Sequence, residues 1–396
     1  MKHFLIIFDG MADEPNPVLD GKTPMQVAYK PNMDKLAAQG IIGKAFTTPQ
    51  GMMPGSDVTN MGILGFDPKL YYSGRGSIEA ASLGIPMTDT DAVFRANLVS
   101  TDGEVMLDSS AGHITDEEAA ELMKAVQKEL GGGELDFFPG VSYRNIAVWH
   151  DGSADVHCYA PYKFIGERLD AHKPEGTNAD KMWEIMTKSR DVLKNHPVNL
   201  KRAAEGKLPA DMLWFWGEST KPAMDSFKKT FGKEGAVVAA VDLIKGIGRL
   251  AGLEITNVPG ATGYIDTNYK GKGEKAVEQA KKYDFVWTHV EAPDESGHEK
   301  SADKKIAAIE SCDKDVLGTI LDFCENLAEP YKILLMPDHP TPIATGNHTA
   351  NPVPFILFDS RRDMGTTLPY DERALPDCKL VVTHTPSLMR MLLSEE

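Results

Sequence analysis

The sequence predicts an α/β protein whose mostly parallel sheet is covered by helices on both faces, with a smaller α+β domain inserted into it. Short apolar runs, typical of strands buried on both faces, alternate with amphipathic helices towards both ends of the chain. Between them lies a stretch in which β-branched and aromatic strands mix with helices. A chain of 396 residues is long enough for two such domains.

The first domain is predicted to contain the short, uninterrupted apolar runs. These strands are expected at residues 4–8, 41–47, 212–216, 236–241, 285–290, 333–336, 352–358 and 380–383. Helices are expected at residues 32–39, 242–251, 274–282 and 301–326, the last because its apolar residues recur at helical spacing. Alternating strands and helices of this kind form a doubly covered sheet.

The inserted domain is predicted from a change in character at about Asp89 that ends at Pro209. Within it, Thr115 and Glu118 have the spacing of a capping box, and the helix that they begin is expected to end at Gly131. We therefore predict a discontinuous domain at residues 1–88 and 210–396, and an insertion at residues 89–209.

Charge and composition exclude several classes of partner. The net charge of −16 argues against nucleic acid and anionic membranes, because both select basic surfaces. No run approaches the roughly 18 apolar residues of a membrane span, and the N-terminal apolar run is too short for a signal peptide. The four scattered cysteines are expected to be buried free thiols of a cytoplasmic protein. A small anionic substrate would need a local positive field, which bound metal ions supply.

The segment KILLMPDHPTPIATGNHT, residues 332–349, indicates a metal site. Asp338 and His339 follow a buried strand directly, and His348 comes after a loop rich in proline and glycine. Open α/β sheets bind their ligands at the carboxyl ends of strands. Taken alone, an Asp-His pair after a strand is more often a capped loop.

Recurrence of the same pattern strengthens this interpretation. The strand at residues 285–290 leads to Asp294 and His298, and the strand at residues 4–8 ends at Asp9. Imidazole and carboxylate ligands suit zinc, manganese or iron, and a cluster of this size exceeds what one ion usually needs. We therefore predict two divalent cations.

Ser56 is the candidate nucleophile. It lies between Gly55 and Asp57, just before a predicted helix, where a sharp turn would expose its hydroxyl. The alternative is that Ser56 is only a helix cap. A neighbouring cation would lower the pKa of the hydroxyl and activate it for a displacement at phosphorus or sulfur.

Four further polar residues are candidates for substrate binding, and each has an exposed surface residue as its alternative. They are Arg75 in a glycine-rich turn, His113 in SAGHI, Arg144 in SYRN and Lys270 in a Gly- and Thr-rich loop. The turn at Arg75 has neither the spacing of a dinucleotide-binding fingerprint nor the Walker lysine.

Seven motifs closely resemble the archaeal type of 2,3-bisphosphoglycerate-independent phosphoglycerate mutase, a family of the alkaline phosphatase superfamily. They are FDGMAD, PGSDVTNMGILGFDP, GRGSIEAASLGI, AVDLIKGIGRLAGLE, VPGATGYIDTNYKGK, HVEAPDESGHE and MPDHPTPI, the last with His348-Thr349. The resemblance covers nearly the whole first domain and is weaker over the insertion. It implies an alkaline-phosphatase-like fold.

The resemblance also implies an activity and the roles of individual residues. One cation would be held by Asp9, Ser56, Asp338 and His339, and the other by Asp294, His298 and His348. Manganese is expected, with zinc, magnesium or cobalt as alternatives, and no 2,3-bisphosphoglycerate is required. Ser56 would take the phosphate of 3-phosphoglycerate and return it to the 2-hydroxyl, a step of glycolysis and gluconeogenesis. The insertion would close over this small phosphorylated metabolite and exclude water.

Other functions remain open at this point. Similar bacterial chains have been proposed as homoserine kinases, and the same cations would serve a phosphatase or a sulfatase. A metal-stabilised binding protein is the alternative from a different class, although it would have no use for an exposed serine. The segment Gly217–Thr220 and the run Asp108-Ser109-Ser110 lack arginines that mutases of this type offer to the substrate. The sequence does not indicate an oligomeric state.

Overall fold

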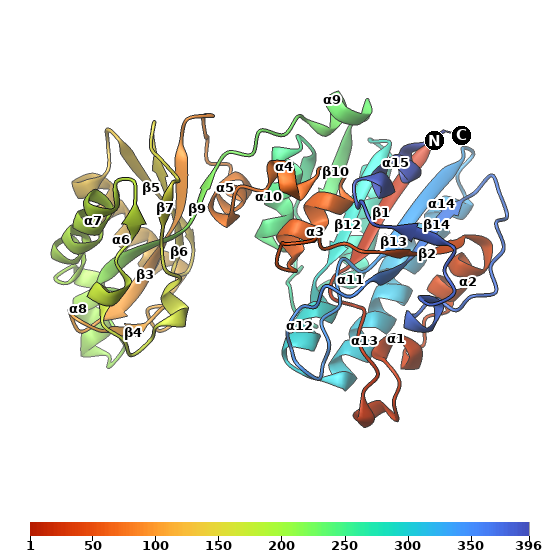
Figure 1. The fold of residues 1–396 in the computed structure, drawn as a ribbon, viewed down its shortest axis with the longest axis horizontal. Helices are drawn as coiled ribbons and strands as arrows, with labels where there is room; N and C mark the ends of the chain where they lie inside the picture. The colour runs from red at the N-terminus through yellow and green to blue at the C-terminus, as the bar shows by residue number, and fades with distance from the viewer. Residues whose placement is uncertain (396) are drawn as a thin grey trace. The chain divides into compact units, whose positions relative to one another are not determined.

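The computed structural model describes residues 1–395 and consists of two compact units. The larger unit contains Met1–Tyr72 and Met224–Glu396, and the smaller unit contains Ser73–Ala223. Each unit has its own sheet and helices (Figure 1).

The larger unit is built on an eight-stranded, mostly parallel sheet. In spatial order its strands are β11 (Glu254–Thr256), β10 (Gly235–Val238), β12 (Phe285–Val290), β1 (Lys2–Phe8), β13 (Tyr331–Met336), β14 (Val353–Asp359), β2 (Ile41–Ala45) and β15 (Leu380–Val382). Only β14 runs antiparallel to its neighbours, β13 and β2. The predicted fold class is confirmed.

Helices cover both faces of this sheet, as the alternation predicted (Figure 1). One group, on one face, includes α3 (Ser56–Ile63), α10 (Asp242–Leu250) and α15 (Ser387–Leu393). The other group includes α1 (Pro24–Val27), α2 (Pro31–Gln39), α11 (Tyr269–Ala280), α13 (Ala302–Ser311) and α14 (Gly318–Glu325). The remaining helices of the unit are α4 (Pro68–Tyr71), α9 (Phe227–Phe231) and α12 (Ala292–His298). The helix predicted at residues 301–326 is α13 and α14, joined by a π-helical turn, Cys312–Leu317.

The centre of the sheet determines where its polar strand ends lie. Strand β1 is fully buried from Phe4 to Phe8, which is why this run is uniformly apolar. It pairs in parallel with β12 on one side and with β13 on the other. In these registers Phe8 lies opposite Val290, and Ile7 lies opposite Met336. The carboxyl ends of the three strands are therefore level with one another.

The smaller unit is an antiparallel sheet with helices. The sheet contains β3 (Ala92–Thr101), β4 (Met106–Asp108), β5 (Leu135–Val141), β6 (Arg144–Trp149) and β9 (Met212–Thr220). A two-stranded ribbon of β7 (Val156–His157) and β8 (Glu175–Gly176), and helices α5 (Arg75–Ser82), α6 (Asp116–Leu130), α7 (Ala179–Leu193) and α8 (Pro197–Ala204), complete it. The predicted capping box is present at the start of α6, between Thr115 and Glu118.

The boundaries of the units differ from the predicted ones. The structure divides the chain after residues 72 and 223, whereas the change in sequence character placed the boundaries after residues 88 and 209. Strand β9 pairs antiparallel with β3 and so belongs to the smaller sheet. Its first residues are buried like those of a central parallel strand because β3 pairs with them and α7 packs against them. The assignment of residues 212–216 to the larger sheet was therefore wrong.

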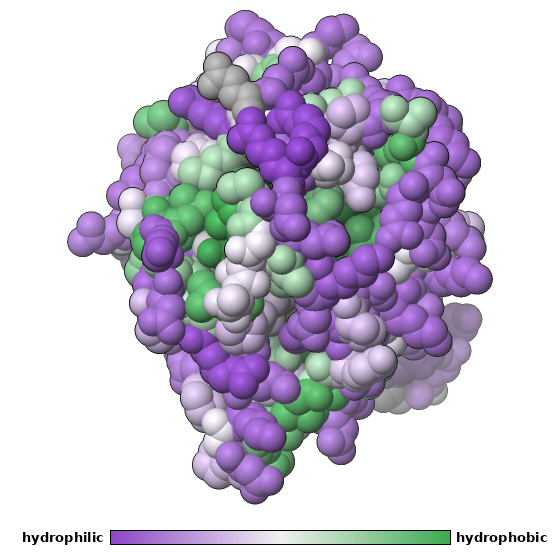
Figure 2. All heavy atoms as spheres, turned by 90° about the vertical axis from the view of Figure 1, so that its right-hand side faces the viewer, coloured by the Kyte–Doolittle hydropathy of each residue, from purple (hydrophilic) through white to green (hydrophobic). Residues whose placement is uncertain are grey.

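The cysteines, the lengths of the helices and the polarity of the surface are the remaining general features. The four cysteines are free and buried. In residues 1–395 no helix combines the length and the apolar character needed to cross a membrane. The face shown in Figure 2 is mostly hydrophilic, with apolar patches between the polar side chains.

Candidate metal centre

The carboxyl ends of three adjacent strands supply most of the predicted site residues. Asp9 follows β1, and Asp338 and His339 follow β13 after one proline. Helix α12 begins two residues after β12 and contributes Asp294 and His298. Because these strands are neighbours in register, residues almost 330 positions apart in sequence lie side by side.

His339 connects the residues of the first group. Its Nε2 atom lies 3.2 Å from Oγ of Ser56, 3.4 Å from Oδ1 of Asp9 and 3.4 Å from Oδ2 of Asp338. All four side chains are buried, and Ser56 has the largest exposure, at 6%. Ser56 is the first residue of α3, so its hydroxyl lies at the positive end of that helix. The buried group thus offers two carboxylates, an imidazole and a hydroxyl around one point.

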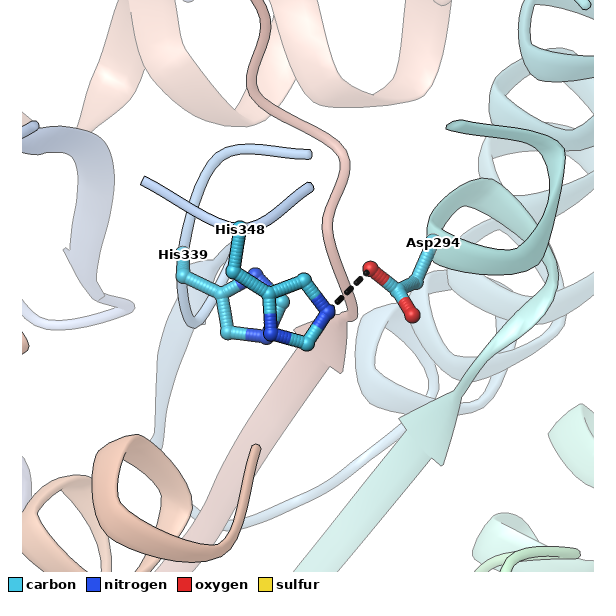
Figure 3. Close-up of side chains that lie close together, drawn as sticks. All are labelled: Asp294, His339 and His348. Atoms are coloured by element: carbon cyan, nitrogen blue, oxygen red, sulfur yellow. Dashed lines mark ion pairs between the residues drawn. The ribbon is translucent and has the colours of Figure 1, made fainter. Parts of the chain in front are cut away.

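Asp294 connects the residues of the second group. Its carboxylate lies 3.0 Å from Nε2 of His298 and 3.4 Å from Nε2 of His348. These two imidazole nitrogens are themselves 3.0 Å apart. The rings of His348 and His339 lie 3.9 Å apart, so the two groups form one continuous network, as Figure 3 shows for Asp294, His339 and His348.

Burial and neighbouring charges shift the pKa values of the candidate ligands in this network. Burial and the negative charge of Asp338 raise the pKa of Asp9, and Oδ1 of Asp9 is buried without a hydrogen-bond partner. Burial opposes ionisation of Asp294 as well, but hydrogen bonds from His298 and then His348 lower its pKa well below the usual value. Two facing imidazole nitrogens and an unpartnered carboxylate oxygen fit divalent cations of the zinc and manganese type.

Among the predicted residues, two groups of side chains have the spacing of metal ligands. One contains Asp9, Asp338 and His339, and the other contains Asp294, His339 and His348. His298 joins the second group through its contact with Asp294. All seven predicted residues therefore lie in the same place, which is a necessary condition for a centre with two cations.

Hydrogen bonds hold the Asp338 carboxylate in position. The hydroxyl of Thr59 and the side-chain amide of Asn60 donate to its Oδ2 at 2.9 and 2.8 Å. The backbone N–H groups of Gly10 and His339 donate to its Oδ1 at 3.1 and 2.9 Å. Helix α3 thus contributes the candidate nucleophile and also orients a candidate ligand.

Two residues of the site were missed by reasoning from the sequence. His289, inside β12, lies with its Nε2 atom 2.9 Å from Oδ2 of Asp9. Its Nδ1 atom lies 3.8 Å from Oε2 of Glu291, and with Asp9 these residues form a third group with ligand spacing. Burial lowers the pKa of His289 to about 3 and raises that of Glu291 to about 8. A histidine in a mostly apolar strand was the available signal.

The candidates for substrate binding are divided between the two units. Lys270 is exposed at the start of α11 in the larger unit. Nearby Lys272 is fully buried, and burial lowers its pKa to about 8. The predicted loop therefore contains a second lysine that sequence reasoning did not single out.

The other three candidates belong to the smaller unit. His113 and Arg144 are exposed and both contact Tyr143, His113 edge-on to its ring and Arg144 with its guanidinium 5.7 Å from the ring centre. Arg75 is exposed at the start of α5. Burial, and to a lesser degree the positive charges of Arg75 and Arg144, lower the pKa of Arg95, against the opposing effect of Glu79. Arg75 and Arg144 thus each lie within electrostatic range of Arg95.

Comparisons with known proteins identify the family of similar chains. The model of the family "2,3-bisphosphoglycerate-independent phosphoglycerate mutase" matches residues 37–199. A protein of that name from Methanosarcina mazei is 44% identical over 99% of this chain and 100% of its own length. A probable mutase of the same name from Geobacter sulfurreducens is 45% identical over 99% of this chain and all of its own length.

Solved structures show the same fold. A protein from Pyrococcus horikoshii superposes with a TM-score of 0.84 at 30% identity, covering 100% of this chain and 99% of that one. The cofactor-independent phosphoglycerate mutase of Thermoplasma acidophilum superposes with a TM-score of 0.70 at 29% identity, covering 99% of both chains. With relatives this similar along its whole length, the chain belongs to the 2,3-bisphosphoglycerate-independent phosphoglycerate mutase family.

Proposed function

We propose that this chain interconverts 3-phosphoglycerate and 2-phosphoglycerate through a phosphorylated Ser56, at a centre of two divalent cations. One observation carries the proposal: the Ser56 hydroxyl lies 3.2 Å from His339, in a buried cluster of carboxylates and imidazoles. Relatives that match this chain along its whole length are named phosphoglycerate mutases, which supports phosphoglycerate as the substrate. A structural metal site would not need a hydroxyl at its centre.

The proposed ligands form two sets. Asp9, Ser56, Asp338 and His339 would hold one cation, and Asp294, His298 and His348 would hold the other. Bound there, manganese or a similar ion would neutralise charge on the transferring phosphoryl group and favour ionisation of the hydroxyl. Zinc, magnesium and cobalt remain alternatives to manganese. The family's independence of 2,3-bisphosphoglycerate fits a mechanism in which serine itself carries the phosphate.

In the proposed reaction, Ser56 Oγ attacks the phosphorus of 3-phosphoglycerate, the bond from phosphorus to the 3-oxygen breaks, and the 3-oxygen takes up the proton that the serine loses. The glycerate then turns within the site, its 2-hydroxyl attacks the phosphoserine, and the departing Ser56 oxygen takes up the proton that the 2-hydroxyl loses. Ser56 lies at the positive end of α3, which favours the negative charge of the phosphoryl group in both steps. Thr59 and Asn60 keep Asp338 oriented throughout.

We propose that the smaller unit covers the substrate. Arg75, Arg144 and His113 are exposed on it. Guanidinium groups bind carboxylate and phosphate with paired hydrogen bonds, and both groups occur in phosphoglycerate. Lys270 is the corresponding candidate on the larger unit. Exclusion of water by this unit would direct the phosphoserine to glycerate rather than to hydrolysis.

The test is an assay that couples 2-phosphoglycerate formation to enolase. Manganese-loaded protein should form 2-phosphoglycerate from 3-phosphoglycerate, and the Ser56→Ala variant should lose at least about 10³-fold in rate while still binding manganese. Stripping the metal with a chelator should abolish the activity, and manganese should restore it. Ser189→Ala, which removes another buried hydroxyl, on α7 of the smaller unit, is the matched control.

Other outcomes would identify other functions. Release of free phosphate alone, from 3-phosphoglycerate or an aryl phosphate, would indicate a hydrolase. Product formed only from homoserine and ATP would indicate a kinase. Full activity of the Ser56→Ala variant would refute the phosphoserine.

A further inference from the structure

Lys305 is a fully buried lysine outside the proposed ligand set. It lies on α13 and is 0% exposed, as is the side chain of its partner Asp13. Its ammonium group makes three hydrogen bonds: to Oδ2 of Asp13 at 2.8 Å, to the carbonyl of Ala12 at 3.1 Å and to the carbonyl of Thr341 at 2.8 Å. A lysine has three donors, so every donor of this ammonium group has a partner.

The two carbonyls belong to loops that carry proposed ligands. Ala12 is three residues beyond Asp9, and Thr341 is two residues beyond His339. The backbone N–H of Thr341 also donates to the carbonyl of Ala12 at 3.1 Å. The ammonium group of Lys305 therefore bridges the loop after β1 and the loop after β13.

The third ligand-bearing segment is connected through the same threonine. The hydroxyl of Thr341 donates a hydrogen bond to the carboxylate of Asp294, and it lies 3.3 Å from Nδ1 of His339. Lys305 itself is on the helix that follows α12, which carries Asp294. One side chain thus links three of the segments that carry proposed ligands, and these segments contribute to both cations.

Asp13 explains how a positive charge is tolerated close to two cations. An isolated ammonium group at this depth would repel them and would be costly to bury. Both carboxylate oxygens of Asp13 also accept the backbone N–H of Ile343, at 3.3 and 3.2 Å, and the N–H of Asp13 donates to Glu372 at 2.9 Å. The pair is neutral overall and is itself held rigidly.

We propose that Lys305 and Asp13 form a positioning lock, which holds the three ligand-bearing segments at the spacing that two divalent cations require. Burying an ion pair contributes little net stability, so its value here lies in geometry. Metal sites lose affinity when their ligands are displaced by about 0.5 Å. The inference rests on the proposed metal centre and assigns a role to two residues that contact neither metal nor substrate.

The test compares two buried lysines of the same sheet unit. Lys332 lies at the amino end of β13, at the opposite end of the strand from the site, and is 4% exposed. Its ammonium group contacts Ser394 and Met391. Lys305→Met and Lys332→Met should both lower the melting temperature of the full-length chain. Only Lys305→Met should weaken manganese binding in calorimetric titration of the metal-stripped protein, by about 10- to 100-fold.

A second readout reports on ligand geometry. The visible absorption spectrum of the cobalt-loaded protein should change in Lys305→Met and stay unchanged in Lys332→Met. If Lys305→Met does not fold, Lys305→Met/Asp13→Asn removes the unpaired carboxylate, and this double variant should show the same loss of affinity.

The outcomes separate the lock from the centre that it serves. Wild-type protein that binds no manganese would overturn the metal centre, and the lock with it. Wild-type protein that binds manganese, together with a folded Lys305 variant of unchanged affinity and spectrum, would overturn the lock alone. Equal losses in the Lys305 and Lys332 variants would also overturn it, because they would show a general effect of stability.

Discussion

The hydrogen bond from Asn60 to Asp338 gives a prediction whose size follows from the structure. The amide of Asn60 donates to Oδ2 of Asp338 at 2.8 Å, and its own carbonyl oxygen is buried without a partner. In Asn60→Leu, a substitution of similar shape, the bond to a charged acceptor is lost, and the unpartnered oxygen is removed as well. The substitution therefore removes this one hydrogen bond with little additional loss of stability.

The expected effect is a weaker metal centre. A hydrogen bond to a charged group contributes about 1.5–3 kcal/mol, equivalent to about 10- to 150-fold in affinity. Thr59 still donates to the same oxygen of Asp338. We therefore expect the lower end, about a tenfold weaker affinity for manganese in Asn60→Leu.

The assay is calorimetric titration of metal-stripped protein with manganese. The matched control is Asn199→Leu: Asn199 is buried in the smaller unit and donates to the carbonyls of Leu193 and Ala210. This variant should be less stable but should bind manganese normally. A folded Asn60→Leu protein with wild-type affinity would refute the view that α3 orients a metal ligand.

Three further predictions concern pH and substrate. A hydrogen bond to Asp294 raises the pKa of His298 to about 9 in the metal-free protein. Since a metal must displace this proton, manganese affinity should rise about tenfold per pH unit from 7 to 9 and then level off; a flat profile would contradict this. The pKa of His298 is higher in the folded than in the unfolded protein, so the stabilisation by the His298–Asp294 pair is complete below about pH 6.5 and is lost as the pH rises through about 9. Urea titrations of the metal-free protein at several pH values would detect this loss. Arg144→Ala should raise KM for 3-phosphoglycerate about tenfold or more. Arg168 is an exposed arginine paired with acidic neighbours, and Arg168→Ala should leave KM unchanged. Equal KM values for the two variants would argue against a role of Arg144 in substrate binding.

The site could be predicted to a large extent because its signals are local. Asp9, Asp294 and Asp338 each follow an apolar strand in the sequence, and parallel strands place such ends at one edge of a sheet. The structure adds that the three strands are adjacent and in register, and that Ser56 lies beside His339. The supporting residues, Asn60 among them, have no local signal because their partners are hundreds of residues away.

The amino-acid sequence by itself determined the fold class, most of the larger sheet's strands and the polar residues at their ends, since these follow from periodicity and from the residues that terminate each strand; it missed β11. Only the tertiary structure decided that β9 belongs to the smaller sheet, that His289 contacts Asp9, and that Lys305 and Asp13 connect the ligand-bearing loops. The physical reason is that strand pairing and buried ion pairs depend on which distant segments meet. A burial pattern records that a segment is covered and carries no information about what covers it.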